Sequence, residues 1–476
     1  MSDRGTDTAR LNAAGWILPA LLGAYAAIIA LAPKPGMALV LAAPLALLPL
    51  AYWTTLRPDR WLFLFFAAVL LLPPLPFGWG NSGPHPSVVF ILFGLLAGLF
   101  GLGGWCVAGA PLNRALGVFF LVLLASTAEA VFYSGAKVGL GSLVRVMLFG
   151  ISVYVFFYTA YSPAARAPHD VFAQVRRLYW IAVAAALFAC VDFYFQLPAP
   201  AGFGQQYIWL RSGVYRRAQG LFYEASTLGN FCVFFLVMIA AALFARRQEA
   251  PIARLWLWLG GAVFAAALVL SYSRGSLLNA LVALAVLIWL HRSRMRWGRL
   301  VLVAAGFAVA ALLVLRALLP AFTFAYLMRV SASVQYVFSE TEGLLSGRVA
   351  SWRAVLEFLA QHPWHALFGI GYKTLPYTDY LGAKIITDNM YLSLLAETGI
   401  AGLAALIWLS VEILRSARRA AGSTDARRRF FGSWILAFWA GQVVQMFTGD
   451  LLTYWRVLPL YFWVLAVAIR DEHSLP

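Results

Sequence analysis

The stretch STLGNFCVFFLVMIAAALFARR, Ser226 to Arg247, decides the fold of this chain. After a short polar start it is a continuous apolar run that ends on two arginines. About 20 apolar residues span the hydrocarbon core of a bilayer as a helix, and inside lipid the backbone must satisfy its own hydrogen bonds. The run does not alternate with polar residues, which argues against a strand of a membrane barrel. The stretch therefore predicts a transmembrane helix.

Similar runs recur along the whole chain. Its 476 residues are 62% hydrophobic and 12% charged, with a mean hydropathy of +0.80. Because a globular core could not bury so much apolar surface, we predict an all-α, polytopic membrane protein with about 12–14 transmembrane helices. About fourteen spans can be placed, near residues 14–32, 37–55, 60–77, 87–108, 114–133, 141–161, 177–196, 226–245, 254–272, 275–291, 299–320, 390–414, 430–449 and 455–470. The polar start, MSDRGTDTAR, lacks a small-residue cleavage site, so we expect the first helix to be retained.

Arginines at the joints between spans predict the orientation. Basic residues in short loops stay on the cytoplasmic side. Here they fall in every second loop, at Arg57/Arg60, Arg166/Arg176/Arg177, Arg246/Arg247/Arg254, Arg292/Arg294/Arg296/Arg299 and from Arg415 to Arg429. Both termini are therefore expected in the cytoplasm, and two long segments, near 197–225 and 321–389, are expected in the periplasm. The second should contain amphipathic helices.

The net charge of +17 does not indicate nucleic acid binding, because most of the excess lies beside predicted helix ends, where topology already explains it. The three cysteines, Cys106, Cys190 and Cys232, lie within apolar runs. They predict neither a disulfide framework nor a zinc site.

Two groups of charged residues on the predicted periplasmic side are not required by topology. The first is Arg216, Arg217 and Glu224, within RSGVYRRAQGLFYEASTLGN. The second is Arg274, in the tight turn SYSRGS between two spans. Each has an ordinary alternative, since arginines at helix ends reach to lipid headgroups and an acid at a helix start interacts with the helix dipole.

A third group lies in the second long segment. There LLSGRVASWRAVLEFLAQHPWHALFGIGYKTL has the apolar spacing of an amphipathic helix that ends at His362-Pro363, with Arg348 near its start. The pair Asp388-Asn389 then precedes a membrane helix in TDNMYLSLLAETGIAGL. The simple alternative is that Asp388 is only the N-cap of that helix.

Together these residues suit chemistry on a lipid-linked diphosphate. Guanidinium groups bind phosphate bidentately and keep their charge at any working pH. A carboxylate beside them could accept the proton of an attacking hydroxyl.

The order of these elements resembles the bacterial O-antigen ligases and Wzy-type polysaccharide polymerases, membrane glycosyltransferases of the GT-C class. The elements are a basic stretch leading into GLFYEASTLGN, then SYSRGSLL, SGRVASW, GIGYK and DNMYLSLLAETGIAG, over residues 211–403. The resemblance implies a ligase/polymerase-like core at 197–414, between transmembrane helices at 1–196 and 415–476.

The resemblance also implies an activity: transfer of glycan from an undecaprenyl-diphosphate-linked oligosaccharide to an acceptor glycan lipid, at the periplasmic face of the bacterial inner membrane. No metal or other cofactor is implied. The diphosphate would be bound by Arg216 or Arg217, Arg274 and Arg348. Asn389 and Tyr391 would contact or position the acceptor, and a chain-length regulator is a further candidate partner.

One position departs from the family. Ligases usually have His-Asn where this chain has Asp388-Asn389, and that histidine is taken to be the base. Either Asp388 or Glu224 could serve instead, and we expect both to be needed, with Asp388 slightly favoured as the base because it matches the position of that histidine. An aspartate has an ordinary pKa of about 3.9 and is a weak base unless burial raises that pKa. Asp-Asn together with Glu224 favours a polymerase over a ligase that transfers finished glycan to lipid A-core. A transporter is disfavoured, because its ionisable residues would lie within spans near the midplane.

Overall fold

The computed structural model describes residues 23–31, 42–43, 47–54, 59–75, 84–163, 170–197, 204–210, 213–245, 251–292, 348–382 and 384–470, with a few residues between 313 and 331. Its principal helices are α3 (Asp59–Leu71), α4 (Ser87–Phe100), α5 (Pro111–Tyr161), α7 (Val171–Phe195), α8 (Ala225–Phe244), α9 (Arg254–Leu270), α10 (Arg274–His291), α14 (Arg348–Gln361), α15 (Pro363–Phe368), α16 (Met390–Ala421), α17 (Ala426–Gln445) and α18 (Leu458–Ile469).

The predicted all-α membrane class is confirmed. Five of the described helices, α5, α7, α8, α10 and α16, are long and apolar enough to cross a membrane, and α4, α9, α18 and most of α3 are shorter apolar helices. Each predicted span from residue 60 to 291 and from 390 to 470 corresponds to a helix or part of one. The predicted spans at 14–32 and 37–55 lie about half outside the described residues, and the span at 299–320 lies largely outside them. The division into three domains stays a prediction.

Helix α5 contains two predicted spans rather than one. Its backbone leaves helical geometry at Gly135 (φ 80°, ψ 167°). On either side of that residue the two arms pack against each other, with the Asn113 amide donating to the Tyr161 hydroxyl at 2.8 Å and the Phe119 and Phe149 rings 5.4 Å apart. The chain therefore crosses, turns at Gly135 and returns.

Helix α16 bends at Gly399 (φ 66°) where it meets the end of α15. A Cβ on Gly399 would overlap the carbonyl of Leu367, and a Cβ on Gly369 (φ 82°) would overlap the carbonyl of Glu397. Only glycine permits both this close approach and these positive φ angles. The amphipathic segment predicted before His362-Pro363 is present as α14, which ends at Gln361.

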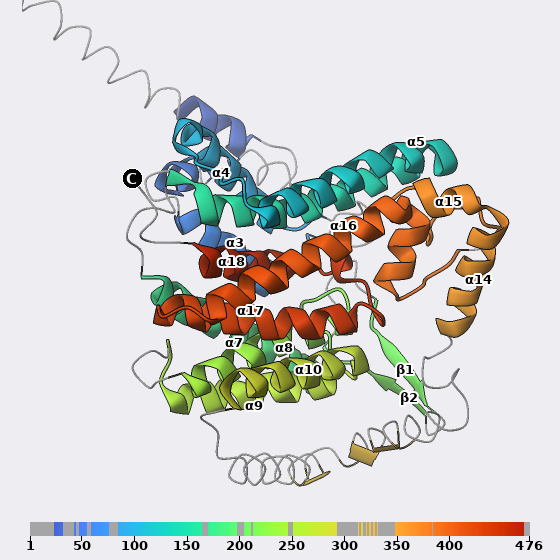
Figure 1. Ribbon diagram of the computed structural model, residues 1–476. Helices are drawn as coiled ribbons and strands as arrows, with labels where there is room; N and C mark the ends of the chain where they lie inside the picture. The colour runs from blue at the N-terminus through green and yellow to red at the C-terminus, as the bar shows by residue number, and fades with distance from the viewer. Residues whose placement is uncertain are drawn as a thin grey trace, which may run out of the picture.

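The helices run side by side, and the smaller elements gather at one end of the bundle (Figure 1). These are α14, α15 and an antiparallel hairpin of β1 (Tyr207–Leu210) and β2 (Gly213–Arg216), which the sequence did not predict. We call this the hairpin end. A second hydrophobic cluster there joins α14 and the segment after α15 to the start of α16, through Val355, Phe358, Ile370, Leu375 and Ala396.

Candidate functional site

Three helices begin at the hairpin end. The C-terminal end of α17 is hydrogen-bonded to each of them. The Met390 amide at the start of α16 donates to the carbonyl of Met446 at 2.9 Å. The Gln445 side chain donates to Ser276 of α10 at 3.3 Å and accepts from Asn230 of α8 at 2.7 Å. Glu224, Arg274 and Asp388 lie at or next to these helix starts, so one scaffold positions all of them.

The scaffold is a buried polar network that the sequence analysis missed. Gln442 and Gln445 of α17 accept from Asn230 and from Asn279 of α10 at 2.6–3.2 Å, and the Tyr461 hydroxyl of α18 donates to Asn230. A polar group left unsatisfied in hydrocarbon costs several kcal/mol, roughly. The network therefore holds these four helices in one mutual orientation. The available signal was the placement of Asn230, Asn279 and the Gln442/Gln445 pair within apolar runs.

The two adjacent arginines of the β-hairpin have different surroundings. Arg216 forms a buried ion pair with Asp192 of α7 at 2.9 Å, and both side chains are at most 6% exposed. Arg217 is half-buried and donates to the carbonyl of Ser271 at 2.9 Å. The structure thus directs Arg216 into the bundle, whereas Arg217 lies beside the SYSRGS turn.

Arg217 also lies within electrostatic range of the other candidate residues. Burial lowers the pKa of its guanidinium, while Tyr454, Glu224 and Asp388 oppose that shift and Arg348 adds to it. Arg217, Glu224, Arg348 and Asp388 therefore lie close to one another in space, although they come from three segments far apart in the sequence.

Asp388 is paired with an arginine. The Arg348 Nε–H donates to Asp388 Oδ2 at 3.1 Å, Arg348 Nη2 forms an ion pair with the same oxygen at 3.0 Å, and the Asp388 side chain is 47% exposed. The N-cap of α16 is Asn389, whose side chain accepts from the Leu392 amide at 3.1 Å. The alternative in which Asp388 is the N-cap is therefore wrong.

Glu224 is half-buried at the start of α8, where it is the N-cap residue but makes no capping hydrogen bond. Its carboxylate accepts from the Ser226 hydroxyl at 2.9 Å. Burial raises the pKa of this carboxyl above its usual value; the charges of Asp388 and Asp450 add to the shift, while Ser226 and Lys373 oppose it. Glu224 thus has the raised pKa that a base needs.

An ion pair between Lys373 and Asp450 lies next to Glu224 and was not predicted as part of a site. Burial by itself would lower the pKa of Lys373, but Asp450 and Glu397 outweigh burial and hold the pKa above its usual value. Lys373 belongs to the GIGYK stretch, so that motif was a signal for it. Asp450 follows α17 and had no motif.

Strained backbone gathers around these residues. Of four described non-glycine residues with positive φ, three lie here: Tyr272 (φ 52°) two residues before Arg274, Lys373 (φ 58°) and Asp388 (φ 45°). Such conformations cost about 1–3 kcal/mol each and cluster at functional sites.

The remaining predicted residues are placed as follows. Arg274 is the first residue of α10 and is half-exposed; its neighbour Gly275 packs against Thr448, beyond the end of α17. The Tyr391 hydroxyl donates to the carbonyl of Val443 at 2.8 Å, which ties it to α17. Tyr391 and Asn389 therefore both make structural contacts here.

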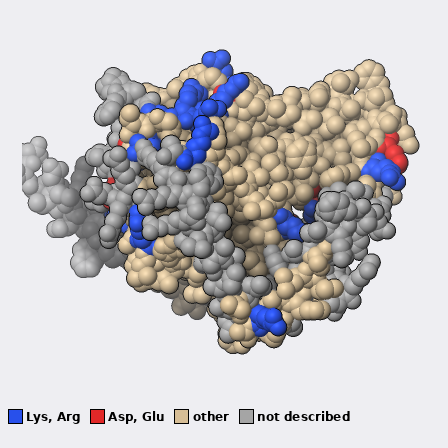
Figure 2. All heavy atoms as spheres, turned by 60° about the horizontal axis from the view of Figure 1, so that its bottom comes forward, with Lys and Arg blue, Asp and Glu red and all other residues tan. Residues whose placement is uncertain are grey.

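The surface of this region is hollowed, with Lys or Arg atoms lying at the edge of a small hollow (Figure 2). Within the described part of the chain, no three His, Cys, Asp or Glu side chains come together to hold a metal ion. Transfer without a metal stays a prediction.

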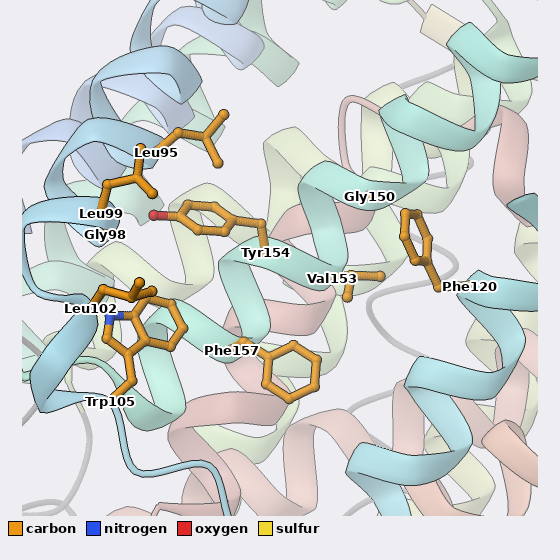
Figure 3. Close-up of a pocket in the computed structure, with 10 residues that line it drawn as sticks. All are labelled: Leu95, Gly98, Leu99, Leu102, Trp105, Phe120, Gly150, Val153, Tyr154 and Phe157. Carbon is orange, nitrogen blue, oxygen red and sulfur yellow. The ribbon is translucent and has the colours of Figure 1, made fainter.

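A separate cavity of about 390 Å³ lies between α4 and α5. Tyr154 extends across it from α5, and the lining includes Leu95, Leu99, Trp105, Val153 and Phe157 (Figure 3). Because the lining holds no acid or cation, this cavity suits a hydrocarbon chain and not a reaction site.

Residues 259–407 match a family model described as Wzy_C, O-antigen ligase. The matched segment runs from within α9 to within α16 and contains Arg274, Arg348 and Asp388, while Arg217 and Glu224 precede it. The resemblance inferred from the motifs is thereby confirmed. No curated protein matches the chain.

Proposed function

We propose that the protein polymerises the repeat units of a surface polysaccharide, because residues 259–407 match the O-antigen ligase family model and several helices are long and apolar enough to cross a membrane. The donor is an undecaprenyl-diphosphate-linked oligosaccharide, and the reaction takes place at the periplasmic face of the inner membrane. The observation that carries the proposal is the group formed by Glu224, Arg217, Arg348 and Asp388, where Arg217 lies within electrostatic range of the half-buried Glu224 carboxylate and Arg348 is paired with Asp388.

In this reaction Arg217, Arg348 and Arg274 bind the diphosphate. Glu224 accepts the proton of an acceptor hydroxyl, whose oxygen attacks the anomeric carbon of the donor sugar. The bond between that carbon and the phosphate oxygen breaks, and undecaprenyl diphosphate leaves with the electron pair. Arginines near the leaving group stabilise the charge that develops on it.

Glu224 is the better candidate for the base. The Asp388 carboxylate is already engaged by the Arg348 guanidinium, two nitrogens of which lie 3.0 and 3.1 Å from its Oδ2 atom. The Glu224 carboxylate accepts one hydrogen bond, from a neutral hydroxyl, and burial raises its pKa. Asp388 then orients Arg348 toward the diphosphate.

A second candidate function is ligation of finished glycan to lipid A-core, which the description of the matching family favours. It shares the donor and differs in the acceptor. Incubating the purified protein with lipid-linked repeat units alone separates the two, because a polymerase lengthens the glycan on the carrier and a ligase needs the core acceptor.

Replacing Arg217 or Arg348 with alanine is expected to weaken binding of the lipid diphosphate donor about 10- to 100-fold. Each change removes charge-assisted hydrogen bonds of about 1.5–3 kcal/mol. Donor binding would be measured by titration of the full-length protein in nanodiscs. Arg353→Ala, on the exposed face of α14, is the matched control and should bind normally. Normal binding by both site variants would refute the diphosphate assignment.

The transfer rate is expected to fall as the pH drops through the pKa of Glu224, because only the ionised carboxylate can accept a proton. Since burial raises this pKa, the acidic limb should lie above pH 4.5, the ordinary value for glutamate. The negative charge of Asp388 adds to the shift, so Asp388→Asn should move the limb to lower pH. A pH–rate profile at saturating donor measures both effects. A limb that moves to higher pH in Asp388→Asn would contradict the assignment.

A further inference from the structure

Arg145, on the second arm of α5, lies over the ring of Tyr377 with its guanidinium carbon 4.4 Å from the ring centre. The residue is half-buried, and it takes part in none of the ion pairs found among the described residues. Lys373, a cation within electrostatic range of Arg145, is already paired with Asp450. Arg145 is therefore a partly desolvated cation whose recorded partner is an aromatic face.

The contact with the Tyr377 ring does not use the N–H donors of the Arg145 guanidinium. A guanidinium over a ring interacts through its face, while its five N–H donors lie in its own plane and form a fork that matches a carboxylate. A partly buried position strengthens such a pair relative to one in water.

Two tyrosines beside Arg145 offer surface for a sugar ring. Tyr377 is 38% exposed, and Tyr223, which directly precedes Glu224, is 43% exposed. The Tyr223 hydroxyl lies within electrostatic range of Glu224, Tyr377 and Arg145. The C–H groups on one face of a pyranose are weakly positive and pack well on the negative face of an aromatic ring.

We propose that Arg145, Tyr223 and Tyr377 form a subsite that binds an acidic sugar of the glycan, with the sugar stacked on a tyrosine and its carboxylate paired with Arg145. The subsite rests on the proposed function, because it orients a glycan beside Glu224. It also narrows the substrate to repeat units that contain a uronic acid.

Arg145 is distinct from the arginines assigned to the diphosphate. Arg217 interacts electrostatically with Glu224, Arg348 and Asp388, whereas Arg145 interacts with Tyr223, Tyr372 and Lys373. A purely structural role is the competing explanation, since Arg145 also joins α5 to the segment after α15, as does the 2.8 Å hydrogen bond from Ser134 to Thr378.

The test uses two probes that differ in one group on each sugar: a tetramer of galacturonic acid and the same tetramer with its carboxylates reduced to alcohols. Binding of each to the full-length protein in nanodiscs is measured by saturation-transfer NMR. The wild-type protein should bind the acidic tetramer about tenfold more tightly, which corresponds to about 1.4 kcal/mol. Arg145→Gln should reduce that preference to less than about twofold, and Arg145→Lys should keep part of it.

Lys137→Gln is the matched control, because Lys137 is an exposed cation on the same arm of α5 and its loss should leave the preference unchanged. Equal binding of both probes by the wild type would overturn the subsite. So would an equal loss of both probes in Arg145→Gln, which is the result expected of a structural contact.

Binding of undecaprenyl diphosphate in the same preparations separates the subsite from the proposed function. If the wild type does not bind the carrier but retains the Arg145-dependent preference, the donor assignment is wrong and the subsite stands. If Arg145→Gln loses carrier binding and keeps the preference, Arg145 belongs to the diphosphate site and the subsite is refuted.

Discussion

Replacing Glu224 with glutamine is expected to reduce glycan transfer about 10²- to 10⁴-fold, the usual contribution of a general base. The change keeps the shape of the side chain and one acceptor oxygen for Ser226, but removes the group that accepts the proton. Donor binding should stay within about twofold of wild type, because the arginines assigned to the diphosphate are untouched. Transfer would be measured at saturating donor, and donor binding by titration in nanodiscs.

Asp388→Asn serves as the comparison. It removes the charge that holds Arg348, so the main loss should be in donor binding rather than in the rate at saturation. Glu357→Gln replaces an exposed carboxylate on α14 and should alter neither donor binding nor the rate at saturating donor. The opposite pattern, with full activity in Glu224→Gln and a lost rate with normal donor binding in Asp388→Asn, would make Asp388 the base.

Removing Arg216 is expected to destabilise the protein by about 3–5 kcal/mol, because it leaves the buried charge of Asp192 without a partner. The free energy of unfolding of Arg216→Ala would be compared with that of wild type by SDS titration of purified protein in mixed micelles. Arg217→Ala should have a much smaller effect, since Arg217 is only half-buried and its recorded hydrogen bond is to a backbone carbonyl.

The double variant Arg216→Met/Asp192→Leu tests the cause of that loss. Replacing a buried ion pair by apolar residues of similar volume is often neutral or stabilising. The double variant should therefore recover most of the lost free energy and keep normal donor binding. If Arg216→Ala had the same free energy of unfolding as wild type, or if the double variant lost donor binding, the assignment of a structural role to Arg216 would be wrong.

Much of the fold follows from the sequence because lipid leaves the backbone few options. An apolar run as long as Ser226–Ala245 must be a helix that bonds its own backbone, and the runs from residue 60 to 291 correspond to helices for that reason. Local signals were also direct: His362-Pro363 follows the end of α14, and the first three residues of SYSRGS form the turn between α9 and α10, with Arg274 as the first residue of α10. The ordered motifs sufficed to indicate the family whose model matches residues 259–407.

The composition of the site was decided by the tertiary structure. Arg216 and Arg217 are neighbours at the end of a strand, where successive side chains point to opposite faces, and only the packing of the hairpin on α7 decides which one meets Asp192. Likewise, either member of the pair Asp388-Asn389 could cap a helix. The Asp388 carboxylate is paired with the Arg348 guanidinium, and Asn389 is the residue that caps α16.

Two contacts near the site join residues that lie far apart in the sequence. Dozens to hundreds of residues separate Lys373 from Asp450 and Arg145 from Tyr377. The strength of a contact with a charge or an aromatic ring depends on the distance between the two groups in space. The order of residues in the sequence does not give that distance. The bends at Gly135 and Gly399 and the amide network on α17 bring these side chains together. The sequence thus determined the helices and the chemical groups at their ends, and the packing of those helices determined which groups face one another.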